Sequence, residues 1–322
     1  MKLSICTDVF GKIPFTDMLD KVKAYGLDAI ELTTGGWGGC FFVPSAEELI
    51  KNPEKLRSFK EEIDKRGLTI SALNCSGNPL IDTPMGHAHS KTIHDTVVLA
   101  ELLGVKTIVT MSGLPGGAPG DKTPNWIAST VSWPEFDGSK YMVEAVTYQW
   151  KVAKEWWTEF AQFAKDHGIE KIAIEEFPCQ LVHNVRSLNT LVEAVGPELG
   201  KLIGMNLDPS HLMIQGADPI AAARALGDKI FYVHGKDARI ERGLADVNGL
   251  LENLPVTETK DRTWNYVAVG CGKDLQWWKE FFSVAHMMGY DGFVSLEMED
   301  LTMSVDAGLK TSIDALKATI SQ

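Results

Sequence analysis

Short apolar segments alternate with longer amphipathic segments along the chain. Apolar runs of about 4–8 residues are typical of buried strands, and an apolar period near 3.6 is typical of helices. Strands are therefore expected over 3–6, 28–32, 68–73, 106–111, 170–175, 202–207, 229–233 and 293–297. Helices are expected over about 14–25, 45–66, 89–103, 141–167, 184–195, 219–226, 275–288 and 305–320.

Regular alternation of strand and helix predicts a parallel sheet, and eight such units predict closure into a (β/α)8 TIM barrel. A doubly wound sheet would need a glycine-rich phosphate-binding turn after the first strand, but that stretch is 7–12, TDVFGK. The length of 322 residues also fits a barrel with insertions. We therefore expect one barrel domain over 1–322.

Two long insertions interrupt the pattern, at about 113–140 and 237–272. Each follows a strand, so both are expected on the C-terminal face of the barrel, where active sites lie. The first contains Trp126 and Trp133 and the second contains Trp264. Because disordered segments are poor in aromatic residues, we expect ordered lids, with Trp126 as a substrate contact. The alternative is that these rings only pack on the barrel rim.

The formal net charge is −12, from 31 basic and 43 acidic residues. An acidic surface argues against nucleic-acid binding and against anionic membranes. No apolar run approaches the ~20 residues of a membrane span, and the first residues show no signal-peptide pattern, so a cytoplasmic location is expected. The five cysteines are scattered, which favours reduced thiols over disulfides or a thiolate metal site.

Four ionisable residues occupy the same place in four consecutive strand units. Glu175, Asp208, His234 and Glu297 each lie at or next to the C-terminal end of an apolar strand. Those ends are neighbours on one rim of a barrel, and the converging carboxylates would repel each other without a cation. Each residue alone would be read as an ion-pair partner or a core group. Oxygen-rich ligation with one nitrogen favours Mn²⁺, with Mg²⁺ or Co²⁺ as alternatives, over structural zinc.

Around these residues the chain resembles the sugar phosphate isomerase/epimerase family, xylose isomerase-like barrels related to ketose 3-epimerases, inosose dehydratases and deglycosidases that cleave 3-keto C-glycosides. The matching segments are ALNCSGNPL, IAIEEFP, MNLDPSHLMIQGADP, FYVHGKDA and GFVSLEMED. The resemblance implies metal ligation by the same four residues and contact of His211 with a substrate oxygen. Many relatives carry a second histidine two residues before the strand-seven ligand, where this chain has Tyr232.

The expected chemistry is proton transfer through an enediolate of a sugar or keto-sugar, with Glu175, Glu297 and His211 as catalytic residues. Return of the proton to a neighbouring carbon gives isomerisation, and return to the opposite face gives epimerisation. The alternative is a lyase or dehydratase that performs β-elimination on a 3-keto glycoside or a keto-inositol. The residues alone do not choose between these reactions.

Weaker candidates for substrate binding are strand-end or insertion residues: Glu31, Asn74, Lys236 and Arg239. Glu31 could equally form a structural ion pair, and Lys236 could orient His234. A phosphorylated substrate is disfavoured, because no glycine-rich cradle follows strands seven or eight. The expected partner is a small carbohydrate, with assembly as a homo-oligomer or with a small subunit.

Two competing classes remain. A DNA-repair endonuclease of this barrel type would hold three zinc ions through further histidines, whereas strand three ends in Asn74-Cys75 and strand four in Thr110-Met111. A non-catalytic sugar-binding subunit would not need an intact set of ligands. Exchange of a substrate α-hydrogen with solvent deuterium separates an enolising enzyme from a binder.

Overall fold

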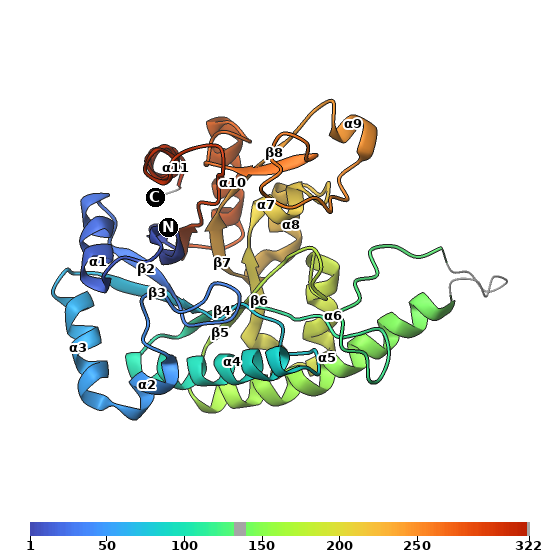
Figure 1. Cartoon of the computed structure of the whole chain (residues 1–322), viewed down its shortest axis with the longest axis horizontal. Coiled ribbons are helices and arrows are strands. Elements are labelled where there is room, and N and C mark those ends of the chain that lie inside the picture. Colours follow the sequence, from blue (N-terminus) through green and yellow to red (C-terminus); the bar gives the residue numbers. More distant parts are fainter. Residues whose placement is uncertain (132–139, 321–322) are drawn as a thin grey trace.

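The computed structural model describes residues 1–131 and 140–320. Eight parallel strands form the barrel, in the order β1-β10-β7-β6-β5-β4-β3-β2, and a bridge between Cys6 and Glu31 joins its two ends (Figure 1). The strands are β1 (Lys2–Ile5), β2 (Ala29–Thr33), β3 (Thr69–Asn74), β4 (Thr107–Met111), β5 (Lys171–Glu175), β6 (Ile203–Leu207), β7 (Ile230–Gly235) and β10 (Phe293–Leu296). The predicted (β/α)8 TIM barrel is confirmed.

Amphipathic helices cover the outside of the barrel, and α5 extends well beyond it (Figure 1). They are α1 (Phe15–Ala24), α2 (Ala46–Lys51), α3 (Pro53–Asp64), α4 (Pro84–Leu103), α5 (Lys140–Asp166), α6 (Val185–Val195), α8 (Pro219–Leu226), α10 (Leu275–Met287) and α11 (Val305–Thr319). Two short helices, α7 (Pro209–Met213) and α9 (Ala245–Asn248), lie in the connections. None of the described helices is long and apolar enough to span a membrane.

Two predicted helix boundaries are wrong for local reasons. The helix expected over 45–66 is two helices, because Asn52 caps the N-terminus of α3 and Pro53 begins it. The helix expected from residue 89 begins at Pro84, where the Thr83 hydroxyl accepts a hydrogen bond from the backbone N–H of Gly86. Proline fits the first helical turn because its missing N–H would have no partner there.

A small polar network lies in the barrel interior beside buried apolar side chains. The Ser71 hydroxyl lies 2.7 Å from the hydroxyls of both Ser4 and Tyr232. Tyr232 is almost fully buried. The residue that stands where many relatives have a second histidine therefore supports the barrel floor.

The second insertion is ordered and begins directly after β7. Its strands β8 (Asp237–Ile240) and β9 (Trp264–Val267) form an antiparallel hairpin. The buried Asp237 carboxylate accepts hydrogen bonds from the backbone N–H groups of Gly270, Gly272 and Lys273, which fixes the end of the insertion to the barrel. In the first insertion, Trp133 lies outside the described residues.

Candidate metal centre and active site

The four strand-end residues meet at one point on the C-terminal rim. Glu175 ends β5, Asp208 follows β6, His234 is in β7 and Glu297 follows β10. One donor atom of each lies within 4.8 Å of the others. His234 Nδ1 is 3.2 Å from Glu297 Oε2, 3.7 Å from Asp208 Oδ2 and 4.0 Å from Glu175 Oε1. The structure thus brings together all four residues that the sequence suggested as ligands.

Two donor atoms in this cluster have no hydrogen-bond partner among the described residues. Asp208 Oδ1 caps α7 by accepting hydrogen bonds from the Ser210 backbone N–H at 2.8 Å and hydroxyl at 2.6 Å. Asp208 Oδ2 and His234 Nδ1 are buried and make no hydrogen bond of good geometry, although His211 Nε2 lies 3.3 Å from the first and Glu297 Oε2 lies 3.2 Å from the second. Buried polar atoms normally have a hydrogen-bond partner, so three carboxylates and an imidazole with two such atoms fit a divalent cation.

Glu31 contacts the ring nitrogen of His234 that points away from the cluster, and Asn74 holds Glu31 in place. His234 Nε2 lies 3.2 Å from Glu31 Oε2, and the Asn74 amide donates to Glu31 Oε1 at 2.7 Å. Metal-bound histidines usually donate their second ring N–H to a carboxylate in this way. Glu31 is completely buried, so it supports His234, whereas Asn74 also lines the cavity described below. Burial opposes the charged form of His234, but Glu31 and Glu297 raise its pKa well above the usual value.

Glu297 is held by a buried lysine. Lys236 Nζ lies 3.0 Å from Glu297 Oε2 and 2.6 Å from Glu299 Oε2, and 4.4 Å from the centre of the Tyr266 ring. Burial raises the pKa of Glu297, but Lys236 and His234 outweigh it and place that pKa well below the usual value. Burial and Glu297 raise the pKa of Glu175. Of the two carboxylates, Glu175 therefore retains a proton more readily.

His211 connects Glu175 to the second insertion. Its Nε2 lies 2.9 Å from Glu175 Oε1, and its Nδ1 lies 3.0 Å from the hydroxyl of Tyr266 in β9. The ring of Phe177 packs against the same imidazole, with ring centres 4.5 Å apart. Sequence reasoning identified His211 but missed Tyr266, because the register of a hairpin inside an insertion has no sequence signature.

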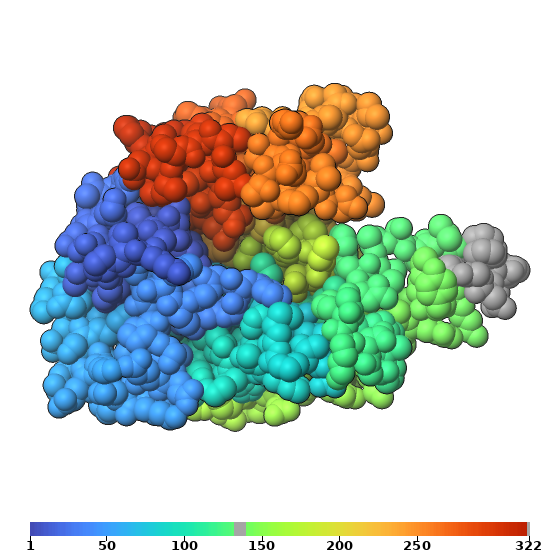
Figure 2. Space-filling model, in the orientation of Figure 1, coloured from blue at the N-terminus to red at the C-terminus, as the bar shows by residue number. Residues whose placement is uncertain are grey.

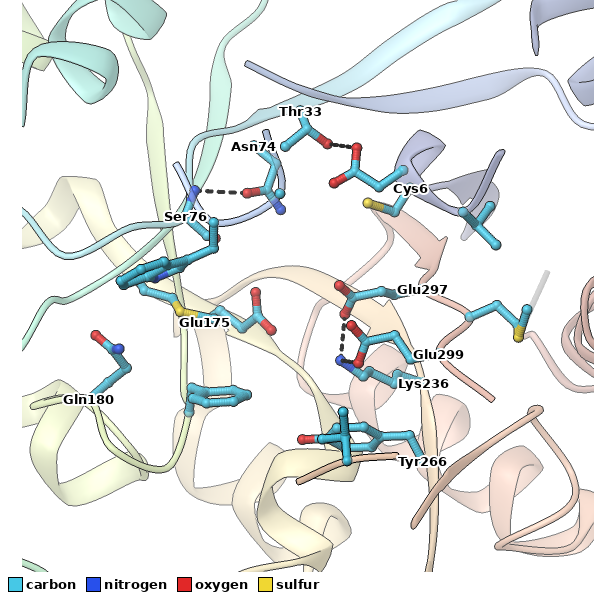
Figure 3. Close-up of a pocket in the computed structure, with 18 residues that line it drawn as sticks. Cys6, Thr33, Asn74, Ser76, Glu175, Gln180, Lys236, Tyr266, Glu297 and Glu299 are labelled. Atoms are coloured by element: carbon cyan, nitrogen blue, oxygen red, sulfur yellow. Dashed lines mark hydrogen bonds and ion pairs between the residues drawn. The ribbon is translucent and has the colours of Figure 1, made fainter. Parts of the chain in front are cut away.

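A cavity of about 640 Å³ opens above the cluster. Figure 3 shows Glu175 and Glu297 facing each other across it, with Lys236 and Tyr266 on the same wall as Glu297. In Figure 2 the surface is hollowed between the orange second insertion and the blue N-terminal part of the chain. Asp208, His211 and His234 are fully buried and do not contribute to the lining.

Two predicted substrate contacts lie elsewhere. Arg239 is in β8, where its guanidinium pairs with Glu241 at 2.8 Å. Trp126 packs beside the ring of His183, with ring centres 5.8 Å apart, and lines a separate pocket of about 240 Å³. None of the described residues of the first insertion lines the main cavity, whereas the second insertion contributes Val256 and Tyr266 to it.

Asp8, Trp37 and Glu176 also belong to the site and are not among the residues that the sequence suggests. Asp8 and Trp37, from the segments after β1 and β2, line the cavity. The Thr33 hydroxyl donates to Asp8, but burial prevails and raises the pKa of Asp8 to about 7. Glu176, next to Glu175, is buried and accepts a hydrogen bond from the Asp208 backbone N–H at 3.1 Å, which holds the segment that carries Asp208.

Comparison with known proteins places these observations in a family. The sequence model of the xylose isomerase-like TIM barrel family matches residues 19–319. An uncharacterized protein, YfiH from Bacillus subtilis (strain 168), is 54% identical over 323 residues, covering 100% of both chains.

Two solved structures show the same fold at low sequence identity. The IOLI protein, whose crystal structure contains a bound zinc atom, is 19% identical with a TM-score of 0.66, covering 100% of both chains. D-Psicose 3-epimerase from Clostridium cellulolyticum H10, solved with D-tagatose, is 14% identical with a TM-score of 0.63, also covering 100% of both chains. The protein belongs to the xylose isomerase-like TIM barrel family.

Proposed function

We propose that this protein is a divalent-metal-dependent isomerase or epimerase of a sugar or keto-sugar. The observation that carries the proposal is the set of four donor residues at the floor of the cavity, two of them with unpaired buried atoms. The names of two structural neighbours support it, since one holds zinc and the other is a ketose epimerase. The oxygen-rich donor set favours Mn²⁺, with Mg²⁺ or Co²⁺ as alternatives.

Glu175, Asp208, His234 and Glu297 would hold the ion. When bound, a divalent ion would supply Lewis acidity to adjacent sugar oxygens and so acidify the hydrogen α to the carbonyl.

Two carboxylates of the chain, Glu175 and Glu297, would each carry out one step of the proton transfer. Glu175 Oε1, next to His211 Nε2, is placed to take or give a proton on one side of the cavity. Glu297 lies on the other side, and Lys236 holds its carboxylate charged. Two carboxylates that face each other and differ in pKa suit removal of a proton from one face of a carbon and delivery to the other. This arrangement favours epimerisation.

The test is solvent exchange and product analysis. Protein loaded with Mn²⁺ is incubated in D₂O with D-fructose, D-psicose and methyl 3-keto-β-D-glucoside, and products are followed by NMR. With at least one of these compounds the proposal predicts deuterium at the α-carbon together with an epimer or isomer, and loss of both with a chelator or in Glu175→Gln. Release of methanol without any epimer would show a β-eliminating lyase instead, and exchange with none of the sugars would refute an enolising enzyme of this substrate class.

A further inference from the structure

The loop after β2 places an aromatic ring in the cavity wall. Trp37 lines the cavity with 49% of its surface exposed. Its backbone N–H donates to the Ser76 carbonyl at 2.8 Å. Its ring stands nearly perpendicular to that of His89, with ring centres 4.6 Å apart and planes at 78°. His89 is itself fixed, because its Nδ1 accepts a hydrogen bond from the Asn78 backbone N–H at 2.9 Å. The indole is therefore held on one side and open on the other.

Two glycines beside Trp37 make this position possible. Gly36 has a φ of +80°, and a Cβ there would lie 2.1 Å from the Ser76 carbonyl oxygen. A Cβ at Gly38 would lie 2.3 Å from Asp8 Oδ2. Only glycine lets the backbone at position 36 approach the Ser76 segment this closely, and a side chain at position 38 would have to displace the Asp8 carboxylate. The backbone on both sides of Trp37 is thus packed onto the rim of the barrel, and the ring is held at the cavity.

The cavity has a volume of about 640 Å³. This volume lies within the range of about 300–1,000 Å³ of pockets that hold drug-sized ligands. Figure 3 shows Ser76 and Gln180 on the side of the cavity opposite Lys236 and Glu299. Trp37 is hydrogen-bonded to the backbone of Ser76. Met111 and Phe177 add apolar lining, and Val256 comes from the second insertion.

We propose that Trp37 is a stacking subsite for a second ring attached to the reacting sugar. The substrate is then a sugar derivative that carries an aryl group or a second pyranose, with its apolar ring face on the indole, and not a free hexose. This inference rests on the proposed function for the position of the reacting sugar. An exposed indole favours an aromatic ring or the apolar face of a sugar over an anionic or flexible group.

The test measures binding without turnover. Methyl β-D-glucoside, phenyl β-D-glucoside and methyl β-cellobioside are titrated into the Mg²⁺-loaded full chain and followed by saturation-transfer NMR. The blocked anomeric carbon of each of these glycosides leaves no carbonyl, so they cannot enolise. Phenyl glucoside should bind about 10-fold more tightly than methyl glucoside, with the strongest saturation on its aryl protons. Methyl β-cellobioside binding as tightly as phenyl glucoside would identify the second ring as a sugar.

Matched variants separate the subsite from general damage to the loop. Trp37→Ala and Trp37→Leu should both bring the affinities of the phenyl and methyl glucosides to within about twofold of each other. Phe41→Ala is the control, because Phe41 lies in the same loop, is similarly exposed and does not line the cavity; it should keep the wild-type ratio.

Equal affinities for all three ligands in the wild-type chain, no detectable binding of phenyl glucoside, or an equal effect of the Trp37 and Phe41 variants would overturn the subsite. Failure of the proposed function shows separately, as absence of deuterium exchange with any keto-sugar.

Discussion

The substitution Glu31→Gln tests how far the residues behind the metal centre contribute to it. Glu31 does not line the cavity and lies completely buried next to His234, on the side away from the other three donor residues. Its two oxygens are 3.2 and 3.3 Å from His234 Nε2, and one of them also accepts the Asn74 amide at 2.7 Å. Glutamine has nearly the same volume, so the packing of the barrel interior is retained while the charge is removed.

The expected loss follows from the hydrogen bonds. A carboxylate offers two acceptor oxygens to two donors, whereas a glutamine amide has one oxygen and an NH₂ group that would face a donor. Either His234 Nε2 or the Asn74 amide then loses its partner in a buried place, which costs about 1–3 kcal/mol. Loss of such a supporting carboxylate typically weakens metal binding by about 10–100-fold, which corresponds to roughly the same range of free energy.

The assay is isothermal titration of the metal-free chain with Mn²⁺. Asp237→Asn is the matched control, because Asp237 is also a buried carboxylate with several hydrogen bonds but is not one of the four donors. We expect Glu31→Gln to weaken Mn²⁺ binding by about 10–100-fold and Asp237→Asn to leave it within about threefold. Wild-type affinity in Glu31→Gln, or an equal loss in both variants, would refute the supporting role of Glu31.

Three further predictions follow from the site. Glu31 and Glu297 outweigh burial and raise the pKa of His234, so we expect Mn²⁺ to displace a proton from this ring when it binds at pH 7. Titrations in buffers of different ionisation enthalpy should show this proton release. Binding without proton release would contradict a protonated His234. The pKa of Asp8 is raised from 3.8 to about 7, so wild-type stability should fall as pH rises between these values, and Asp8→Asn should raise Tm at pH 8 but not below pH 4; an equal effect at both pH values would count against it. Tyr266→Phe removes the hydrogen bond to His211 Nδ1 and should lower kcat about 10-fold with little change in KM. Tyr232→Phe loses a buried hydroxyl in the barrel interior and should leave kcat unchanged. Equal kcat values for the two variants would argue against a role for the Tyr266 hydroxyl.

Much of the architecture could be predicted because it is encoded locally. Each barrel strand is an apolar run, and its ends were placed within about two residues by flanking glycines and charges. The four donor residues could be found because a parallel barrel brings strand ends to one rim, so equal positions in the repeating unit become neighbours in space. The helix starts at Asn52-Pro53 and Thr83-Pro84 are also encoded locally, since both pairs are typical of a helix N-terminus.

The rest of the site depends on tertiary geometry. The position of Glu31 at a strand end was visible in the sequence, but its pairing with His234 depends on the closure of the barrel between β1 and β2. Tyr266 reaches His211 through the pairing of β8 with β9, which no local pattern specifies. Trp37 lies in the glycine-rich loop after β2 and not in a long insertion. Trp126 of the first insertion packs in a separate pocket, so the presence of a tryptophan in a long insertion does not by itself place its ring in the site.

The central claim is that Glu175, Asp208, His234 and Glu297 form one divalent-metal site. The most direct measurement is the Mn²⁺ stoichiometry of the purified, metal-free chain, determined by electron paramagnetic resonance titration for the wild type and for Asp208→Asn. That substitution retains Oδ1 as the cap of α7 and removes the charge from the unpaired atom that faces the cluster. We predict about one tightly bound Mn²⁺ per wild-type chain and at least about 10-fold weaker binding in the variant. No tight binding by the folded wild-type chain, or equal binding by both, would contradict the account.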